Sequence, residues 1–101
     1  MYYVRLKVAE TAKNVLCMDR KELVKETSRP GAETDLVIDF TIHGKDYRTR
    51  KADCEYIAIL WSNEADTTGL YMSDMWHITD WFYRNGKRYG LLADFIENGL
   101  C

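Results

Sequence analysis

The chain has 101 residues, of which 47% are hydrophobic and 30% charged, and its formal net charge is −2. These totals are typical of a folded protein and not of a disordered chain, so we expect residues 1–101 to form a single α+β domain. A chain without a surplus of Lys and Arg lacks the charge by which proteins hold nucleic-acid phosphates. We therefore expect no direct nucleic-acid partner.

The first residues form an alternating pattern. Hydrophobic side chains recur at every second position over residues 2–8, which predicts a half-buried strand. Residues 9–18 are ambiguous: they fit either a continuing helix or a short return strand near Val15–Met18. The sequence does not decide between the two.

A helix start follows directly. Asp19, with Glu22 three residues later, has the pattern of a helix N-cap and predicts a short helix near 19–27. This helix must end before Pro30, which is the only proline and marks a loop.

The middle of the chain predicts two strands joined by a turn. Residues 36–42 alternate between hydrophobic and polar, and His43-Gly44-Lys45 suits a tight turn. We therefore expect a β-hairpin over 36–50. The next stretch, 55–61, is hydrophobic on both faces of a strand, which favours a central strand, although a buried helix fits the same pattern. A polar loop should follow over 62–72.

Two helices are expected after this loop. Ser73 is a good N-cap and Gly86 a good left-handed stop, so the first helix should cover 73–85. The second should cover 89–98 and end at Gly99, with the next residue packing back on the helix in a Schellman motif. The expected fold is thus a small antiparallel sheet of three to four strands packed against two C-terminal helices and the short helix near 19–27.

The helix over 73–85 has more hydrophobic surface than one core contact explains. At about 100° per residue its hydrophobic arc covers about 220°, whereas a surface helix usually shows about 100–140°. Either the rest of the chain covers the excess, or it forms an interface with a protein partner, because interfaces are enriched in Trp, Tyr and Arg. The predicted protein-binding residues are Trp76, Trp81, Tyr83, Arg84, Arg88 and Tyr89.

No catalytic or metal-binding pattern stands out. His77, Asp80 and Arg84 share one helix face, but the sequence places no nucleophile beside His77, and Asp80–Arg84 has the spacing of an exposed ion pair. The three cysteines are widely spaced, and two histidines offer no set of converging metal ligands. We expect a non-enzymatic protein with reduced thiols and with neither cofactor nor metal.

Localisation follows from missing signals. The first residues contain no hydrophobic run of signal-peptide length, and no segment reaches the ~18–20 apolar residues of a membrane span. We expect a cytoplasmic protein that makes no contact with membranes.

A second function class is also open. The basic turn 86–90 precedes a predicted helix, whose free N–H groups favour anions, so it suits a small anionic ligand or a nucleotide. In that alternative the ligand-binding residues are Lys87, Arg88, Tyr71 and Trp61.

The first function class is a protein-binding module, with homodimerisation as one form of binding. Small, mildly acidic domains without catalytic motifs are also typical of phage or mobile-element proteins that inhibit a host defence enzyme, such as anti-CRISPR proteins. This narrower prediction rests on size and composition alone.

Overall fold

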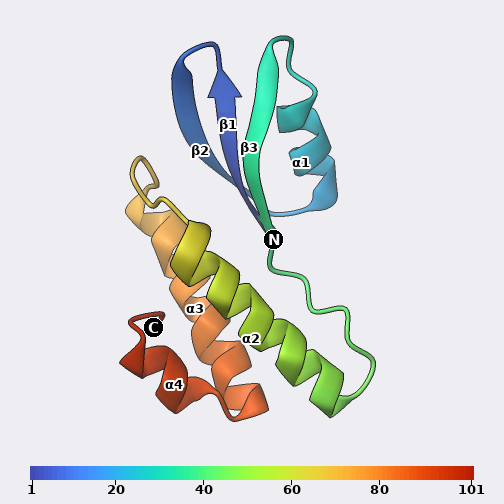
Figure 1. Cartoon of the computed structure of the whole chain (residues 1–101), viewed down its shortest axis with the longest axis vertical. Coiled ribbons are helices and arrows are strands. Elements are labelled where there is room, and N and C mark those ends of the chain that lie inside the picture. The colour runs from blue at the N-terminus through green and yellow to red at the C-terminus, as the bar shows by residue number, and fades with distance from the viewer. The chain divides into compact units, whose positions relative to one another are not determined.

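The computed structural model describes residues 1–101, and these form two compact units. The sheet unit consists of residues 1–41 and 66–70, and the helical unit of residues 42–65 and 71–101. The fold is α+β, with one three-stranded antiparallel sheet and four helices, two of them C-terminal, which confirms the predicted class (Figure 1). None of the helices combines the length and hydrophobicity required to cross a membrane.

The sheet contains β1 (Tyr2–Val8), β2 (Thr11–Cys17) and β3 (Ala32–Asp39), in the order β2-β1-β3. The predicted first strand is confirmed, and the ambiguous stretch after it is a strand. Both neighbours run antiparallel to β1, and a bulge interrupts its pairing with β3. On one face of the sheet a small core forms around Val4, Leu6 and Cys17.

The turn between β1 and β2 is strained. It consists of Ala9 and Glu10, and Ala9 has a φ of 56°, in the left-handed region that costs a non-glycine residue about 1 kcal/mol. Replacing Ala9 by Gly is therefore expected to raise the free energy of unfolding by about 0.5–1 kcal/mol in urea denaturation. Ala12→Gly in β2 is the control and should lower it, because Ala12 has ordinary strand geometry. A loss of stability in both variants would show that Ala9 is not strained.

The short helix is confirmed as α1 (Arg20–Thr27). Its predicted cap is formed in both directions: the Glu22 N–H donates to Asp19 Oδ1 at 2.8 Å, and the Met18 N–H donates to Glu22 Oε2 at 2.6 Å. Leu23 packs from α1 against the sheet core. Local capping and one apolar contact thus fix this helix in the sheet unit.

The segment 66–70 joins the sheet unit through hydrogen bonds. Its anchor is the carbonyl oxygen of Asp66, which accepts from the Tyr3 hydroxyl and, at 2.7 Å, from the Asn14 side-chain amide. The Asp66 carboxylate lies 3.5 Å from the Arg5 guanidinium, and hydrogen bonds from Thr68 lower its pKa. These contacts hold the loop against β1 and β2.

The predicted hairpin at 36–50 is wrong. Of its first strand only residues 36–39 belong to β3, which ends at Asp39, and its return strand lies at the start of α2 (Tyr47–Glu64). A capping box explains the difference: the Thr49 N–H donates to Asp46 Oδ1 at 2.8 Å, and the Asp46 N–H donates to Thr49 Oγ1 at 3.2 Å. Such a cap starts a helix, and the sequence pattern 46–49 contained it.

Gly44 also has another role than the predicted turn. It is not among the glycines with positive φ. Instead, a Cβ at this position would lie 2.5 Å from the backbone nitrogen of Arg50, so only glycine lets the chain pass so close to the first turn of α2.

The predicted central strand at 55–61 is also wrong, and the helical alternative is correct. The buried side chains of α2 follow a helical period of three and four residues, because they are Cys54, Ile57, Ala58 and Trp61. In a stretch hydrophobic on both faces of a strand, this pattern is hidden among equally hydrophobic neighbours. The predicted loop 62–72 therefore starts later, since α2 continues to Glu64.

The two C-terminal helices are α3 (Met72–Tyr89) and α4 (Leu92–Glu97). Gly86, the predicted stop, lies inside α3, and the helix ends instead at Gly90, which has a φ of 70°. At the end of α4 the predicted Schellman motif is confirmed: Gly99 has a φ of 74°, and the Leu100 N–H donates to the Phe95 carbonyl at 2.8 Å.

Aromatic rings form the core of the helical unit. Phe82 on α3 is fully buried, and its ring centroid lies 5.1 Å from that of Trp81 and 5.5 Å from that of Phe95, both edge-on. Trp61 of α2 lies 6.5 Å from the same ring. Phe82 thus joins all three helices of this unit.

Candidate functional site

Helix α3 has a buried face and two flanks. The buried face points into the helical unit and consists of Ile78, Phe82, Gly86 and Tyr89. At about 100° per residue, Met72, Trp76 and Tyr83 fall within about 40° of one another on one flank. Trp81, Arg84 and Arg88 fall on the other flank. The predicted aromatic surface is therefore divided.

The first flank carries large hydrophobic side chains with much of their surface exposed. The exposed fraction is 86% for Met72, 73% for Trp76 and 46% for Tyr83. We call these three residues the apolar stripe. A tryptophan is normally largely buried, because its ring is the largest apolar surface of any side chain. Its exposure here makes the stripe the most unusual surface of the helical unit.

A recess of about 210 Å³ lies along the stripe and is lined by Trp76, Thr79, Asp80, Tyr83 and Cys101. Asp80 is the one charged residue in its lining, and Asp80 Oδ2 lies 2.9 Å from Arg84 Nε. Nearby, Lys87 Nζ lies 6.0 Å from the centre of the Tyr83 ring. Burial raises the pKa of the Cys101 thiol. The recess thus offers aromatic walls, and its one charged lining residue is already in an ion pair.

The other predicted binding residues lie apart from the stripe. Trp81 is half-buried, packs edge-on against Phe82, and lies about 140° around the helix from Trp76. Arg84 is committed to its ion pair with Asp80. Arg88 is exposed on the flank of Trp81. Of the predicted set, only Trp76 and Tyr83 thus lie on the apolar stripe.

Tyr89, the sixth predicted residue, is part of the core. Its ring is buried, its hydroxyl accepts a hydrogen bond from Arg50 Nε at 2.8 Å, and its ring centroid lies 5.8 Å from that of Tyr47. Tyr89 therefore connects the end of α3 to the start of α2 and offers no surface to a partner.

The basic stretch 86–90 is the C-terminal end of α3 and not a turn that opens a helix. The N–H groups of Gly90 and Leu91 donate to the Gly86 carbonyl, so they are not free to bind an anion. This end of a helix carries a partial negative charge, which attracts cations. The geometry of 86–90 gives no support to anion binding.

The remaining residues of the small-ligand alternative are far apart. Tyr71 precedes α3, whereas Lys87 lies sixteen residues later, about 24 Å along the helix axis. Trp61 is buried in α2. These three side chains cannot line one small pocket.

Two of the thiols are buried and have low reactivity. Burial raises the pKa of Cys17, and it raises the pKa of Cys54 to about 11, so both are protonated at neutral pH. His77 is exposed on α3 beside the Asp80–Arg84 pair. No group of three or more His, Cys, Asp or Glu side chains converges as metal ligands would.

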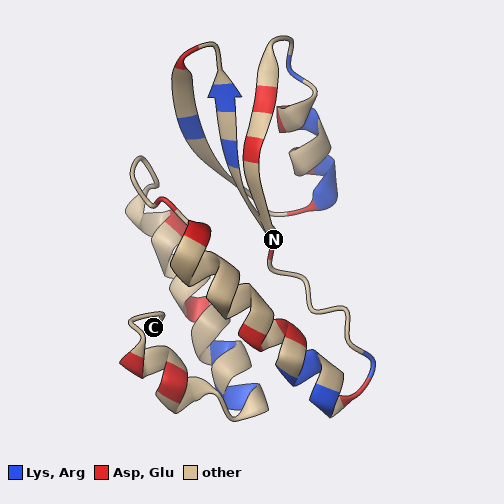
Figure 2. Cartoon of the chain, in the orientation of Figure 1, with Lys and Arg blue, Asp and Glu red and all other residues tan.

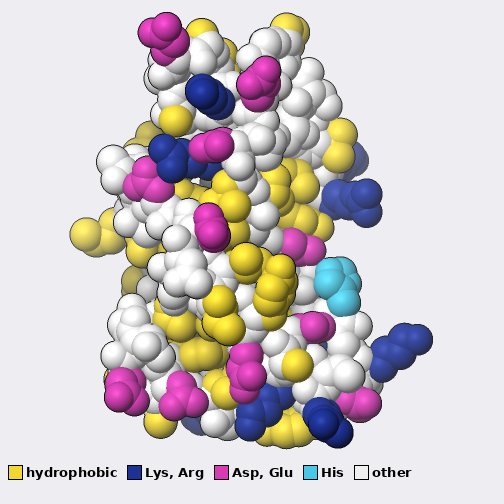
Figure 3. All heavy atoms as spheres, in the orientation of Figure 1, with side chains coloured by type: hydrophobic (Ala, Val, Ile, Leu, Met, Phe, Trp, Pro, Cys, Tyr) yellow, Lys and Arg dark blue, Asp and Glu magenta, His cyan; other side chains and the backbone are white.

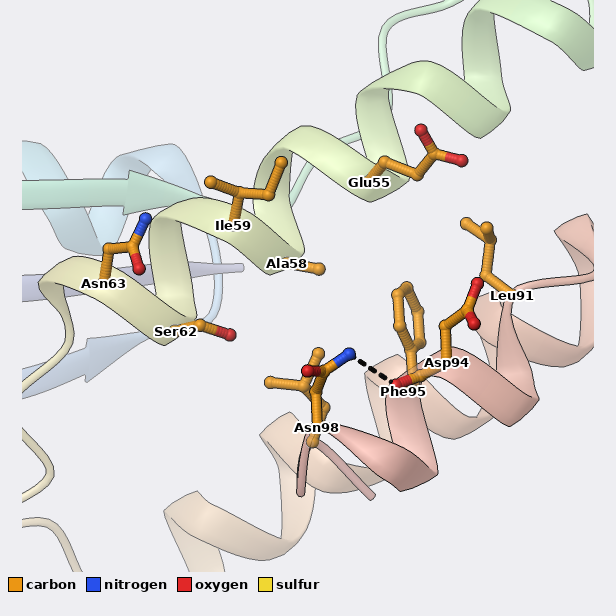
Figure 4. Close-up of a pocket in the computed structure, with 10 residues that line it drawn as sticks. Glu55, Ala58, Ile59, Ser62, Asn63, Leu91, Asp94, Phe95 and Asn98 are labelled. Atoms are coloured by element: carbon orange, nitrogen blue, oxygen red, sulfur yellow. Dashed lines mark hydrogen bonds between the residues drawn. The ribbon is translucent and has the colours of Figure 1, made fainter.

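Sequence reasoning missed two features. Met72 extends the apolar stripe and is four residues before Trp76, but the predicted helix began one residue too late to include it. The second feature is a groove of about 340 Å³ between α2 and α4 (Figure 4). The wrongly predicted strand at 55–61 prevented its prediction, because a strand would place the residues of this groove wall on two opposite faces of a sheet.

Comparison with protein-family models, with curated protein sequences and with solved structures gave no match.

Proposed function

We propose that this chain is a non-enzymatic protein-binding module whose contact surface is the apolar stripe of α3. The observation that carries the proposal is the exposure of Trp76, at 73%, between two other exposed hydrophobic side chains of the same flank. Tryptophan and tyrosine are the residues that most often dominate binding energy at protein interfaces. The recess beside them gives a partner side chain a place to insert.

Helix geometry supports one continuous contact. Met72, Trp76 and Tyr83 are four and seven residues apart, so they form a row along about three turns of α3. A partner that covers this row must also cover Cys101, which lines the same recess. A second copy of the chain is one such partner, in which case the protein is a homodimer.

The test compares Trp76→Glu with Tyr56→Glu. Tyr56 is a matched control because it is also an exposed aromatic residue on a long helix, with an exposed fraction of 62%, and lies outside the stripe. Light scattering first gives the mass of each protein. If the wild type is a dimer through the stripe, Trp76→Glu should give folded monomers and Tyr56→Glu should not.

If the wild type is monomeric, affinity for a captured partner is measured. Loss of a central tryptophan costs about 2 kcal/mol or more at an interface, so Trp76→Glu should weaken binding at least about 30-fold. Bound partner should also slow alkylation of Cys101, the most accessible of the three thiols. The proposal fails if Trp76→Glu unfolds the protein, or if both variants bind equally.

An inhibitor of a host defence enzyme is a narrower proposal within this class. It requires that the partner be an enzyme and that its activity fall in proportion to the amount of this protein bound. The same Trp76→Glu variant should then restore that activity, whereas Tyr56→Glu should still inhibit.

A further inference from the structure

The groove between α2 and α4 is lined by hydrophobic and by polar side chains. The hydrophobic ones are Ala58, Ile59, Leu91, Phe95 and Leu100, and all of them except Ile59 are buried. The polar ones are Glu55, Ser62, Asn63, Asp94 and Asn98. On the face seen in Figure 3, hydrophobic side chains lie between α2 and α4 with acidic side chains beside them.

The two carboxylates stand on opposite walls. Figure 4 shows Glu55 on α2 and Asp94 on α4, with Leu91 and Phe95 pointing from the α4 side toward α2. Neither carboxylate pairs with a lysine or arginine, since the ion pairs of the chain involve other acidic residues. Helix α4 carries acidic residues and no basic ones (Figure 2).

Most other acidic side chains of the helical unit are committed to internal bonds. Asp46 caps α2, Asp53 accepts from the His43 and Gly44 N–H groups, Asp74 accepts from the Tyr71 N–H, and Asp80 pairs with Arg84. Glu55 and Asp94 have no such role. Their charge is therefore available to a ligand, at a place where hydrophobic surface is available too.

We propose that this groove binds a small organic cation, namely an ammonium group attached to an aromatic or branched hydrocarbon. The hydrocarbon would lie on Phe95 and Leu91, and the ammonium would lie between Glu55 and Asp94. A space of 340 Å³ holds about ten non-hydrogen atoms of such a ligand. Pockets between helices that combine apolar walls with a few polar groups are typical small-molecule sites.

Charge selects this ligand class over its neutral and anionic analogues. An anion would meet two negative charges, and a neutral ligand would gain only the hydrophobic contact. A hydrogen bond from an ammonium group to a carboxylate is stronger than one between neutral groups. The proposal does not depend on the apolar stripe, because none of the stripe residues lines the groove.

The experiment titrates the protein with 3-phenylpropylamine, 3-phenylpropan-1-ol and 3-phenylpropanoate while the backbone amide signals are followed by NMR. The amine is expected to bind with a Kd of about 1 mM, at least about tenfold more tightly than the alcohol. Signals of residues on both groove walls should shift. Trp76→Glu should bind the amine as the wild type does, which separates this result from the proposed function.

Four conservative variants locate the charge. Glu55→Gln and Asp94→Asn should each weaken amine binding at least about threefold and leave alcohol binding unchanged. Glu64→Gln on α2 and Glu97→Gln on α4 are the controls, because both residues are exposed on the same helices but outside the groove. Equal binding of amine and alcohol, no saturable amine binding, or equal loss in the control variants would each overturn the proposal.

Discussion

Gly86→Ala is expected to lower the free energy of unfolding by about 1–3 kcal/mol, although alanine is the better helix former. A Cβ at this position would lie 2.7 Å from Phe95 Cδ2 and 3.2 Å from Leu92 Cα. The second atom belongs to the backbone of α4, and the ring of Phe95 is held edge-on against Phe82. Neither neighbour can move away without disturbing the core. Urea denaturation followed by tryptophan fluorescence measures the change.

A double-mutant cycle with Phe95→Leu identifies the cause. Leucine lacks the ring atom Phe95 Cε2, which lies 3.2 Å from the same Cβ position, and its Cδ atoms are not held in a rigid ring, so it should relieve part of the clash. The cost of Gly86→Ala should then be at least about 0.5 kcal/mol smaller in the Phe95→Leu background than in the wild type. A cost that is the same in both backgrounds, or a gain in stability from Gly86→Ala alone, would contradict the close contact.

The sequence predicted those elements whose signals are local. Strand β1 follows from simple alternation, and α1 follows from the pair Asp19 and Glu22, whose reciprocal hydrogen bonds the structure contains. The Schellman motif at Gly99 is of the same kind. In each case the residues that decide the structure are neighbours in the chain, so no distant contact is needed to interpret them.

The predictions are wrong where tertiary packing determines the local structure. Gly86 has the residue type of a helix stop, but it continues α3 because the missing side chain makes room for α4. Gly44 has the residue type of a hairpin turn, but it makes room for the start of α2. Residue type cannot distinguish a glycine that is needed for its φ from one that is needed for the space it leaves.

The candidate surfaces show the same limit. The hydrophobic excess of α3 was visible in its sequence, but how it divides into a core face and two flanks depends on where α2 and α4 pack. Trp76 and Trp81 are the same residue type on the same helix, yet the first is exposed and the second is half-buried against Phe82. The groove forms only when residues 55–61 are helical. A prediction of a strand at 55–61 therefore excludes a prediction of the groove.

Phe82→Ala is expected to be the most damaging single substitution in the helical unit, at about 3–5 kcal/mol. Phe82 is fully buried, and its ring contacts the rings of Trp61, Trp81 and Phe95. Removing it leaves a cavity that three rigid rings cannot fill. Because domains of this size have a total stability of about 5–15 kcal/mol, the variant should be near its unfolding threshold. Thermal unfolding followed by circular dichroism measures the effect.

Tyr83→Ala is the matched control, since Tyr83 is adjacent on α3 but exposed, and it should cost less than about 1 kcal/mol.

The reactivity of the buried thiols tests whether residues 1–101 unfold as the single domain predicted from sequence. Cys54 lies in the helical unit and Cys17 in the sheet unit, and both are buried. In one cooperative domain, Phe82→Ala must make both react faster with a thiol reagent. If Cys54 alone becomes reactive, the two units unfold separately, because loss of the aromatic core would then leave the stability of the sheet unit unchanged.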